Sequence, residues 1–435
     1  MPLILGIGLW APMEMDPAMR NRIVRTCLLI SAFPATLGMA ATILVPDHRS
    51  TIQAGIDAAQ NGDVVSVRPG TYCEQIDFRG KAISVVGSPA RKTVIDGSSL
   101  ASTARGALVK FTSGEGSGSL LDGFTITGRD NGDGFLTAGG IYCSGSSPKI
   151  SNCIVTGNSS ASTGGGVACV DASPTLTNCL ISNNSSDYAA GVHCFIGSPV
   201  FTKCTISENT ARVSRWDGGA GLHLQQSDLT LANCTISDNF SPGNGGGLWA
   251  DFHSSIELTN CKLSGNVSRG NGAAIYLRGS AELTNCLITD NHAGSGSIDS
   301  VVNCDRDSSM RMTYCTIADN TAGDGGAVRT YWGGETVLYG CIVWGNAPAT
   351  ISSWEDPGVA FSNIEGGFPG QGNIAADPQF ASYRDFDYLL EAGSPCIDAG
   401  SAEIPDGIRW PSWYPNRGRS DMGAWGGPDA AGWQR

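Results

Sequence analysis

The segment Leu231-Ala232-Asn233-Cys234-Thr235-Ile236-Ser237-Asp238-Asn239, followed by Gly245-Gly246-Gly247-Leu248, decides the fold, because similar segments recur along the chain. The shared unit is a short run around a cysteine, a closing asparagine, a polar loop and a Gly-Gly-x-aliphatic element. Copies of its first part occupy residues 153–158, 179–184, 204–209, 234–239, 261–266, 286–291, 315–320 and 341–346. Equivalent cysteines are 25 to 30 residues apart. A repeat of this length is typical of a solenoid in which each unit forms one coil.

Apolar and polar residues alternate within the unit, as in Cys234-Thr235-Ile236, which predicts short strands with one buried face. A coil of this length has room for two or three strands and none for a helix. Stacking the strands in parallel, about 4.8 Å apart with right-handed connections, gives an all-β fold, a single-stranded right-handed parallel β-helix. The closing asparagines would form a ladder at a tight corner, where Asn tolerates the left-handed conformation.

The cysteines occupy two slots of the repeat, and both slots are predicted to face inward. The first slot contains the eight cysteines of the repeat unit. The second contains Cys143, Cys169, Cys194 and Cys304, together with Leu224, Ala250 and Leu277 in other coils. This exchange indicates positions that need a buried hydrophobe, which a free cysteine can be. Disulfides between adjacent coils stay open, because the rung spacing lies within the Cα distances of a disulfide. Metal ligation is least favoured, because close Cys-x₂₋₄-Cys spacing is missing.

Segments of different character flank the repeats. Residues 1–40 form an upstream extension and a secretory signal peptide, with translation starting at Met19 and cleavage near Ala40. Residues 41–118 provide the first coils and a short N-terminal capping helix with Ser50 as its N-cap. The repeat coils cover residues 119–365, and residues 366–435 form a C-terminal capping segment.

The charge balance limits the possible partners. A net charge of −13 argues against nucleic acid, whose phosphates would be repelled. No later run is long and apolar enough for a transmembrane segment, so we expect a secreted or cell-surface monomer. The acidic surface leaves room for Ca²⁺ as a cofactor. Residues 130–134, Asp-Asn-Gly-Asp-Gly, do not have the spacing of a calcium loop and are interpreted as an ordinary loop, so no metal ligands are assigned.

The same alternation predicts an outward column of side chains. His193 lies between inward Val192 and Cys194, and later coils carry aromatic or polar residues in the same place and two residues further on. Aromatic rings and hydrogen-bonding groups repeated along a sheet suit an extended glycan. The predicted substrate-binding residues are His193, His223, Trp249, Asp251, Tyr276, Arg278 and Tyr331. The alternative is an ordinary solvated strand surface with a weak charge ladder.

Catalysis would need titratable groups on the same surface, and the candidates are Asp251, Arg278 and Asp305. The two aspartates would lie two rungs apart, about 10 Å by strand spacing, which is wide for the carboxylate pair of an inverting glycosidase. Because Arg278 lies between them, an ion-pair ladder is the simpler interpretation.

Several stretches resemble known families. Residues 51–87, with Gly62-Asp63-Val64-Val65 and Pro69-Gly70-Thr71-Tyr72, resemble the start of pectinesterases and related pectin-lyase-like β-helix proteins. The repeats are similar to those of polymorphic outer-membrane proteins, which are adhesins. Residues 394–400 and 421–425 are similar to the C-terminal segment of uncharacterised secreted bacterial β-helix proteins. The resemblance implies the β-helix fold and an extracellular setting. The catalytic motifs of pectinesterases and polygalacturonases are absent from the sequence.

Three functional classes follow from these observations. The preferred one is a non-catalytic glycan-binding or adhesin-like protein with an extracellular polysaccharide or cell-surface glycan as partner. The second is a polysaccharide lyase or glycoside hydrolase acting on an acidic polysaccharide. The third is a purely structural surface element. Fold resemblance does not separate them, because one fold supports many functions.

Overall fold

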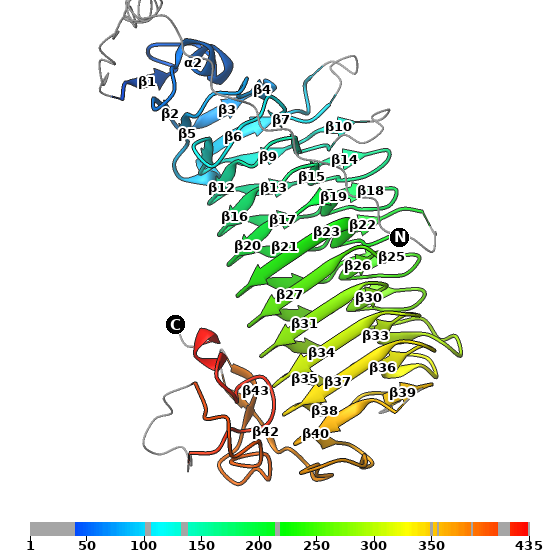
Figure 1. Ribbon diagram of the computed structural model, residues 1–435. Helices are drawn as coiled ribbons and strands as arrows, with labels where there is room; N and C mark the ends of the chain where they lie inside the picture. Colours follow the sequence, from blue (N-terminus) through cyan, green and yellow to red (C-terminus); the bar gives the residue numbers. More distant parts are fainter. Residues whose placement is uncertain are drawn as a thin grey trace, which may run out of the picture. The chain divides into compact units, whose positions relative to one another are not determined.

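The computed structural model describes residues 40–100, 106–131, 138–213, 218–348, 351–354, 356–383, 386–407 and 418–433. The chain divides into two units, Met1–Met39 and Ala40–Arg435, and only the second is described. The predicted signal peptide and the start at Met19 therefore lie outside the described residues, apart from Ala40. The second unit is a right-handed parallel β-helix, whose coils stack one upon the next (Figure 1).

Each coil contributes strands to long parallel sheets, here numbered I to III. Sheet I contains β4 (Ile76–Asp77), β7 (Val109–Phe111), β11 (Ile141–Ser144), β15 (Val167–Val170), β19 (Val192–Gly197), the first part of β23 (Leu222–Ala232), β26 (Leu248–Ala250), β30 (Ile275–Leu277), β33 (Ser300–Cys304), β36 (Gly326–Thr330) and β39 (Ile351–Ser353). Sheet II contains β1 (Thr42–Val45), β2 (Val64–Val67), β5 (Ser84–Val86), β8 (Leu120–Asp122), β12 (Lys149–Ser151), β16 (Thr175–Thr177), β20 (Val200–Thr202), the second part of β23, β27 (Ser255–Thr259), β31 (Ser280–Thr284), β34 (Ser309–Thr313), β37 (Glu335–Tyr339) and β40 (Gly358–Ala360).

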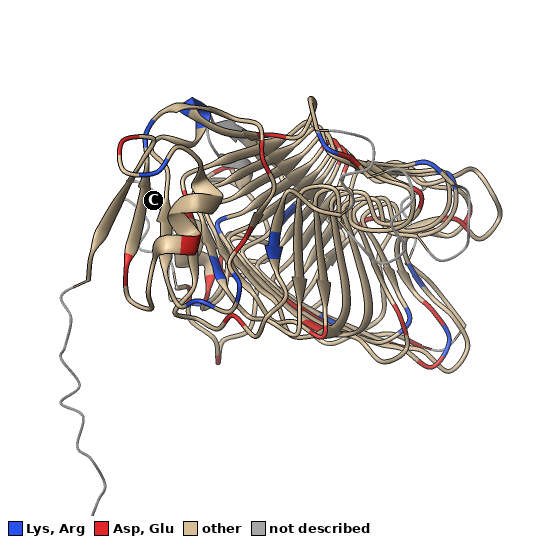
Figure 2. Ribbon diagram, turned by 90° about the horizontal axis from the view of Figure 1, so that it is seen from above, with Lys and Arg blue, Asp and Glu red and all other residues tan. Residues whose placement is uncertain are grey.

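Sheet III follows sheet II in every coil, and the middle coils add a short sheet IV. Sheet III contains β3 (Gly70–Tyr72), β6 (Thr93–Asp96), β9 (Thr125–Thr127), β13 (Ile154–Thr156), β17 (Leu180–Ser182), β21 (Thr205–Ser207), β24 (Thr235–Ser237), β28 (Lys262–Ser264), β32 (Leu287–Thr289), β35 (Thr316–Ala318), β38 (Ile342–Trp344) and β41 (Asn363–Ile364). Sheet IV contains β10 (Asp130–Asn131), β14 (Ser159–Ser160), β18 (Ser185–Ser186), β22 (Thr210–Ala211), β25 (Phe240–Ser241) and β29 (Val267–Ser268). Viewed from above, charged residues lie mainly around the outside of the winding (Figure 2).

The period-two pattern produces this arrangement directly. In sheet III, Ile181, Ile206, Ile236 and Leu263 are paired in register and all four are buried. Their neighbours on either side point away from the core, as expected for a strand with one buried face. A shift of one residue would turn every apolar side chain outward, so the pattern fixes the register of each coil.

Both cysteine columns are confirmed. The eight repeat cysteines are buried, and the Cys204 amide donates to Cys234 Sγ of the next coil at 3.4 Å. All fourteen cysteines among the described residues are free thiols, which selects stacking over disulfides in this structure. Burial raises the pKa of the Cys286 and Cys341 thiols, so they stay protonated and unreactive.

The asparagine ladder is also confirmed, with one correction. Each ladder amide donates from Nδ2 to Oδ1 of the next one at 2.8–3.3 Å, through Asn158, Asn184, Asn209, Asn239, Asn266, Asn291, Asn320 and Asn346. The left-handed conformation, however, belongs to the residue before each ladder asparagine. Glycine occupies that position in some coils, whereas Asn183, Glu208, Asp238 and Asp290 have φ values of 54° to 56°. The ladder side chain points inward from an ordinary backbone, and its predecessor makes the turn.

The first coil is covered by α2 (Ile52–Ala58), which packs on β1, β2 and β4. Ile52, Gly55 and Ile56 form its buried face. Its N-cap is Thr51, whose hydroxyl accepts a hydrogen bond from the Ala54 amide, so the prediction of Ser50 was wrong by one residue. Gly55 permits close packing, since a Cβ there would lie 2.8 Å from Val65 Cγ1.

After the last coil the chain turns back along the flank of the solenoid. The strands β42 (Phe380–Tyr383) and β43 (Phe386–Leu390) form an antiparallel pair, and η2 (Ala430–Trp433) ends the described chain. The Gly423 amide donates to the Gly340 carbonyl at 2.7 Å, and Asn285 Nδ2 donates to the Ala424 carbonyl at 3.0 Å. This segment therefore binds the corner between sheets II and III over several coils.

We expect replacement of Asn209 by Ala to lower the free energy of unfolding by at least about 2 kcal/mol, because buried polar groups would lose their partners. Asn209 Nδ2 donates to the Ile181 carbonyl and to Asn239, and its Oδ1 accepts from Asn184. Urea unfolding followed by circular dichroism measures the loss. Asn183→Gly, at an exposed left-handed position one coil earlier, is the control and should not destabilise; equal losses in both variants would contradict a dominant role for the ladder.

Candidate functional site

The predicted outward column exists, but it is covered. Register pairs join Ala168, His193, His223, Trp249, Tyr276, Asn303 and Arg329 in successive strands of sheet I. His193, His223 and Trp249 are nevertheless buried. The glycine-rich segments that return to sheet I lie on this face: a Cβ added to Gly245 would stand 2.7 Å from Trp249 Cβ. The side chains of the column therefore lie outside the core, and the glycine-rich segments that lead back to sheet I cover them.

The buried rings of this column pack edge to face. Ring centres are 5.4 Å apart for His193 and His223, and 4.5 Å apart for His223 and Trp249. His193 Nε2 lies 3.2 Å from Gln225 Oε1, whereas neither ring nitrogen of His223 has a hydrogen-bond partner among the residues that the structure describes. Burial lowers the pKa of His193 to about 4 and that of His223 well below 6.5. Both rings are therefore neutral near pH 7 and act as packing groups.

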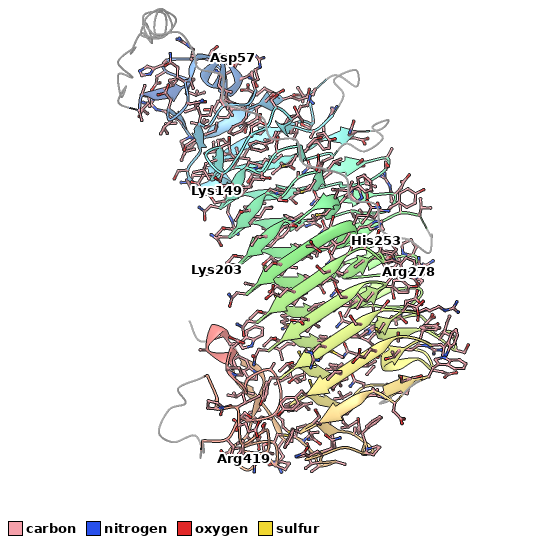
Figure 3. All side chains as sticks on the ribbon, in the orientation of Figure 1. Asp57, Lys149, Lys203, His253, Arg278 and Arg419 are labelled. Atoms are coloured by element: carbon pink, nitrogen blue, oxygen red, sulfur yellow. The ribbon has the colours of Figure 1, made fainter. Side chains whose placement is uncertain are left out.

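An exposed surface lies beside this column, where each strand of sheet I turns toward sheet II. We call it the ridge, and it comprises Asp251, Phe252, Arg278, Asp305, Arg306, Tyr331, Trp332 and Trp354. Figure 3 labels Arg278 and the neighbouring His253 at this turn. The exposed fractions of Phe252, Trp332 and Trp354 are 52%, 64% and 70%. Such exposure is unusual for large aromatic side chains.

Arginines and aromatic rings alternate along the ridge. The guanidinium of Arg278 lies 4.2 Å from the ring centre of Phe252, that of Arg329 4.6 Å from Tyr331, and that of Arg306 6.0 Å from Trp332. These contacts are within the range of cation–π attraction. The contacts of Arg278 and Arg306 fix the orientations of the Phe252 and Trp332 rings at the surface.

The three candidates for catalysis serve structural contacts on this ridge. Asp305 Oδ2 accepts a hydrogen bond from the Tyr276 hydroxyl at 2.8 Å and lies 3.2 Å from Arg278 Nε. Asp251 Oδ1 accepts from the amides of Gln226 and His253 and from the Ser254 hydroxyl. The expected Arg278–Asp305 ion pair is therefore present, and both carboxylates have partners that hold the turns.

A second surface was missed by the sequence reasoning. The outer face of sheet II carries a groove of about 630 Å³, lined by Asp228, Leu229, Thr230, Ser255, Ile256, Glu257, Ser280, Ala281, Glu282, Ser309, Met310, Arg311, Glu335 and Val337. Glu257, Glu282 and Arg311 are neighbours in register on its floor. The alternation in residues 255–259, 280–284 and 309–313 is the sequence signal for this face.

The structure also bears on metals and membranes. Among the described residues, no group of three or more His, Cys, Asp or Glu side chains could hold a metal ion. Within the same residues, no helix is long and apolar enough to cross a bilayer.

The buried histidines predict a pH dependence of stability. The unfolded chain, with histidine pKa values near 6.5, binds protons before the folded chain does, so stability should fall as the pH drops from 6.5 toward about 4. Each buried imidazole contributes a slope of roughly 1.4 kcal/mol per pH unit. The variant His223→Leu should reduce this slope in denaturant unfolding measured at several pH values, whereas the exposed His292→Gln should not. An unchanged slope in His223→Leu would argue against its burial in neutral form.

The family model "Right handed beta helix region" matches residues 115–270 and 246–365, more than half of the chain. No curated protein sequence matches. Among solved structures, the crystal structure of pectate lyase Pel9A is similar over 89% of this chain and 97% of that chain, with 13% sequence identity and a TM-score of 0.49. From the family match, together with its stacked parallel coils, the chain belongs to the right-handed β-helix family.

Proposed function

We propose that this protein is a secreted or cell-surface, non-catalytic glycan-binding protein whose ligand lies along the ridge. The observation that carries the proposal is the exposure of Phe252, Trp332 and Trp354 at equivalent turns of the solenoid. The guanidinium groups of Arg278 and Arg306 lie against the rings of Phe252 and Trp332.

Flat aromatic rings at the surface suit sugar rings. A pyranose presents an apolar face of C–H groups and a rim of hydroxyls, so a ring can stack on indole while hydrogen bonds form at the edge. Exposed tryptophans are also frequent anchors of binding surfaces. The cation–π contacts of Arg278 and Arg306 keep these groups ordered before binding, which reduces the entropy lost when a ligand is held.

The groove on sheet II adjoins the ridge, because β27, β31, β34 and β37 begin directly after the ridge turns. Ser255, Ser280 and Ser309 form one column of its lining, with Asp228 and Glu335 at the two ends. Hydroxyl and carboxylate groups of this kind can bond to the hydroxyls of a polymer that runs parallel to the solenoid axis.

The predicted binding residues take different parts in this proposal. Tyr276, Arg278 and Tyr331 belong to the ridge or its immediate support and would contact or orient the ligand. Asp251 fixes the turn that presents Phe252. His193, His223 and Trp249 lie under the returning chain and would support the surface by packing.

The extracellular setting rests on the signal peptide predicted from the sequence, and a monomer is sufficient for this mode of binding.

We expect Trp332→Ala to weaken binding to the protein's best glycan by about tenfold, as loss of one stacking contact worth over 1 kcal/mol implies. A glycan array of neutral and charged polysaccharides identifies the ligand, and isothermal titration calorimetry measures the affinity. Val200→Ala, an exposed apolar residue on sheet II, is the matched control and should bind normally. Failure of the wild-type protein to bind any polysaccharide on the array would end the proposal.

A glycoside hydrolase or lyase is the second candidate, favoured by the pair Glu257 and Glu282. These side chains are direct neighbours on adjacent strands, at a strand spacing of about 4.8 Å, close to the carboxylate separation of retaining glycosidases. The described lining of the groove carries four carboxylates and, as a cation, only Arg311, so an acidic polysaccharide would need Ca²⁺ to offset the repulsion.

The enzymatic candidate has its own test. We expect no new reducing ends and no unsaturated uronate absorbance when the protein is incubated with uronic-acid and neutral polymers, with and without Ca²⁺. If turnover is observed and is abolished in Glu257→Gln but retained in Thr230→Val, the hydrolase or lyase assignment replaces the binding function.

A further inference from the structure

The groove on sheet II carries an excess of negative charge that its surroundings do not neutralise. Its lining includes the carboxylates of Asp228, Glu257, Glu282 and Glu335, and all four residues are exposed. No arginine, lysine or histidine nitrogen of the described residues lies within 4 Å of these carboxylates. Arg311 is in register with Glu282 but forms no ion pair with it. The groove is therefore a negatively charged surface that is open to solvent.

Two of these carboxylates are direct neighbours. Glu257 and Glu282 lie on adjacent strands in register, at a strand spacing of about 4.8 Å. Like charges in this arrangement destabilise a sheet. The fold does not require them, because the equivalent positions of earlier strands contain Lys149, Thr175 and Val200. A cation bound between the two glutamates would remove the repulsion.

The ridge beside the groove has no such excess of either charge, because it contains two aspartates and two arginines. Arg278 Nε lies 3.2 Å from Asp305 Oδ2, and the guanidinium of Arg306 lies against the ring of Trp332. A ligand that covers both surfaces thus meets aromatic rings on the ridge. In the groove it meets carboxylates that have no cationic partner among the described residues.

We propose that the glycan bound on the ridge carries protonated amino groups, and that the carboxylates of the groove bind these groups. The inference rests on the proposed function and specifies its ligand as a polymer of amino sugars. Asp228 and Glu335 lie four strands apart, about 19 Å by strand spacing, and Glu257 and Glu282 lie on strands between them. Carboxylates spread over this length suit cations that recur along a chain. They do not suit a single metal ion, since no group of three or more His, Cys, Asp or Glu among the described residues could hold one.

An amino sugar has both of the groups that these two surfaces can bind. Its apolar C–H face suits the exposed rings, and its ammonium group is attracted by the carboxylates. The net charge of −13 would also speed the approach of a polycation. An acidic sugar would be repelled by the groove, and a neutral sugar would leave the charges of Glu257 and Glu282 opposed.

The test uses three β-1,4-linked hexasaccharides that differ only at carbon 2 of each sugar: the oligomers of glucosamine, N-acetylglucosamine and glucose. We expect the wild-type protein to bind the glucosamine hexamer at least tenfold more tightly than the other two at about pH 5.5 and low ionic strength, in isothermal titration calorimetry. The preference should shrink at about pH 8.5, where the amines of the ligand lose their protons. Exposed carboxylates are in general ionised throughout this range, so the change reports the charge of the ligand.

Removal of charge from the groove should abolish the preference. The double variant Glu257→Gln, Glu282→Gln should bind the glucosamine hexamer about tenfold more weakly than wild type, and the glucose hexamer equally well. The matched control is Asp238→Asn, Asp290→Asn, which removes the same charge from two exposed positions that follow strands of sheet III. It should bind all three hexamers as wild type does. Thermal unfolding checks folding, and the groove variant should melt no lower than wild type because it loses the repulsion between the glutamates.

The outcomes separate the charge of the ligand from the proposed function. Equal weakening in the two double variants would mean general attraction by the net charge and would overturn the inference. A preference for a galacturonate hexamer over the glucosamine hexamer would overturn it too. If the three hexamers bind equally and Trp332→Ala weakens all of them, the ridge function stands and the amino-sugar inference fails. If no oligosaccharide or polysaccharide binds, both fail.

Discussion

The fold depends on satisfying backbone polar groups at the corner that every coil turns in the same way. The ladder from Asn158 to Asn346 does this with one residue per coil: each amide between the two ends bonds to its neighbours above and below, and every ladder amide bonds to a backbone carbonyl. Without such partners the corner would bury carbonyl and amide groups away from water, at a cost comparable to lost hydrogen bonds. The ladder also fixes the alignment of the coils, since an amide can reach its neighbour only when the coils are in register.

Much of this architecture could be predicted from the sequence, because every repeat unit shows the same pattern of inward-facing and turn-forming residues. The inward slots, the parallel register, the stacked thiols and the ladder all follow from residues such as Cys204, Ile206 and Asn209 recurring at fixed offsets. The location of the left-handed residue could not be settled in this way. Asn183 and Asn184 are identical residues, and only the backbone shows that the first makes the turn and the second points inward.

The candidate site was harder to predict, for a related reason. Alternation tells which side of a strand a residue is on, and it correctly put His193, His223 and Trp249 outside the core. It does not tell what else lies on that side. The glycine-rich returns cover the column, and this depends on the path of the loops and on close contacts such as that between Gly245 and Trp249. The exposed rings of Phe252 and Trp332 lie in turns, where no alternation exists to point to them.

The left-handed corner has a consequence for how these molecules behave in concentrated solution. In some coils the position is glycine, but Glu208, Asp238 and Asp290 place an acidic side chain there despite the less favourable backbone conformation. Their exposed carboxylates form a row of one sign along the flank of the winding. Two copies approaching side by side along this row would each present negative charge to the other. Charge repulsion therefore disfavours parallel bundling of the solenoids through this edge.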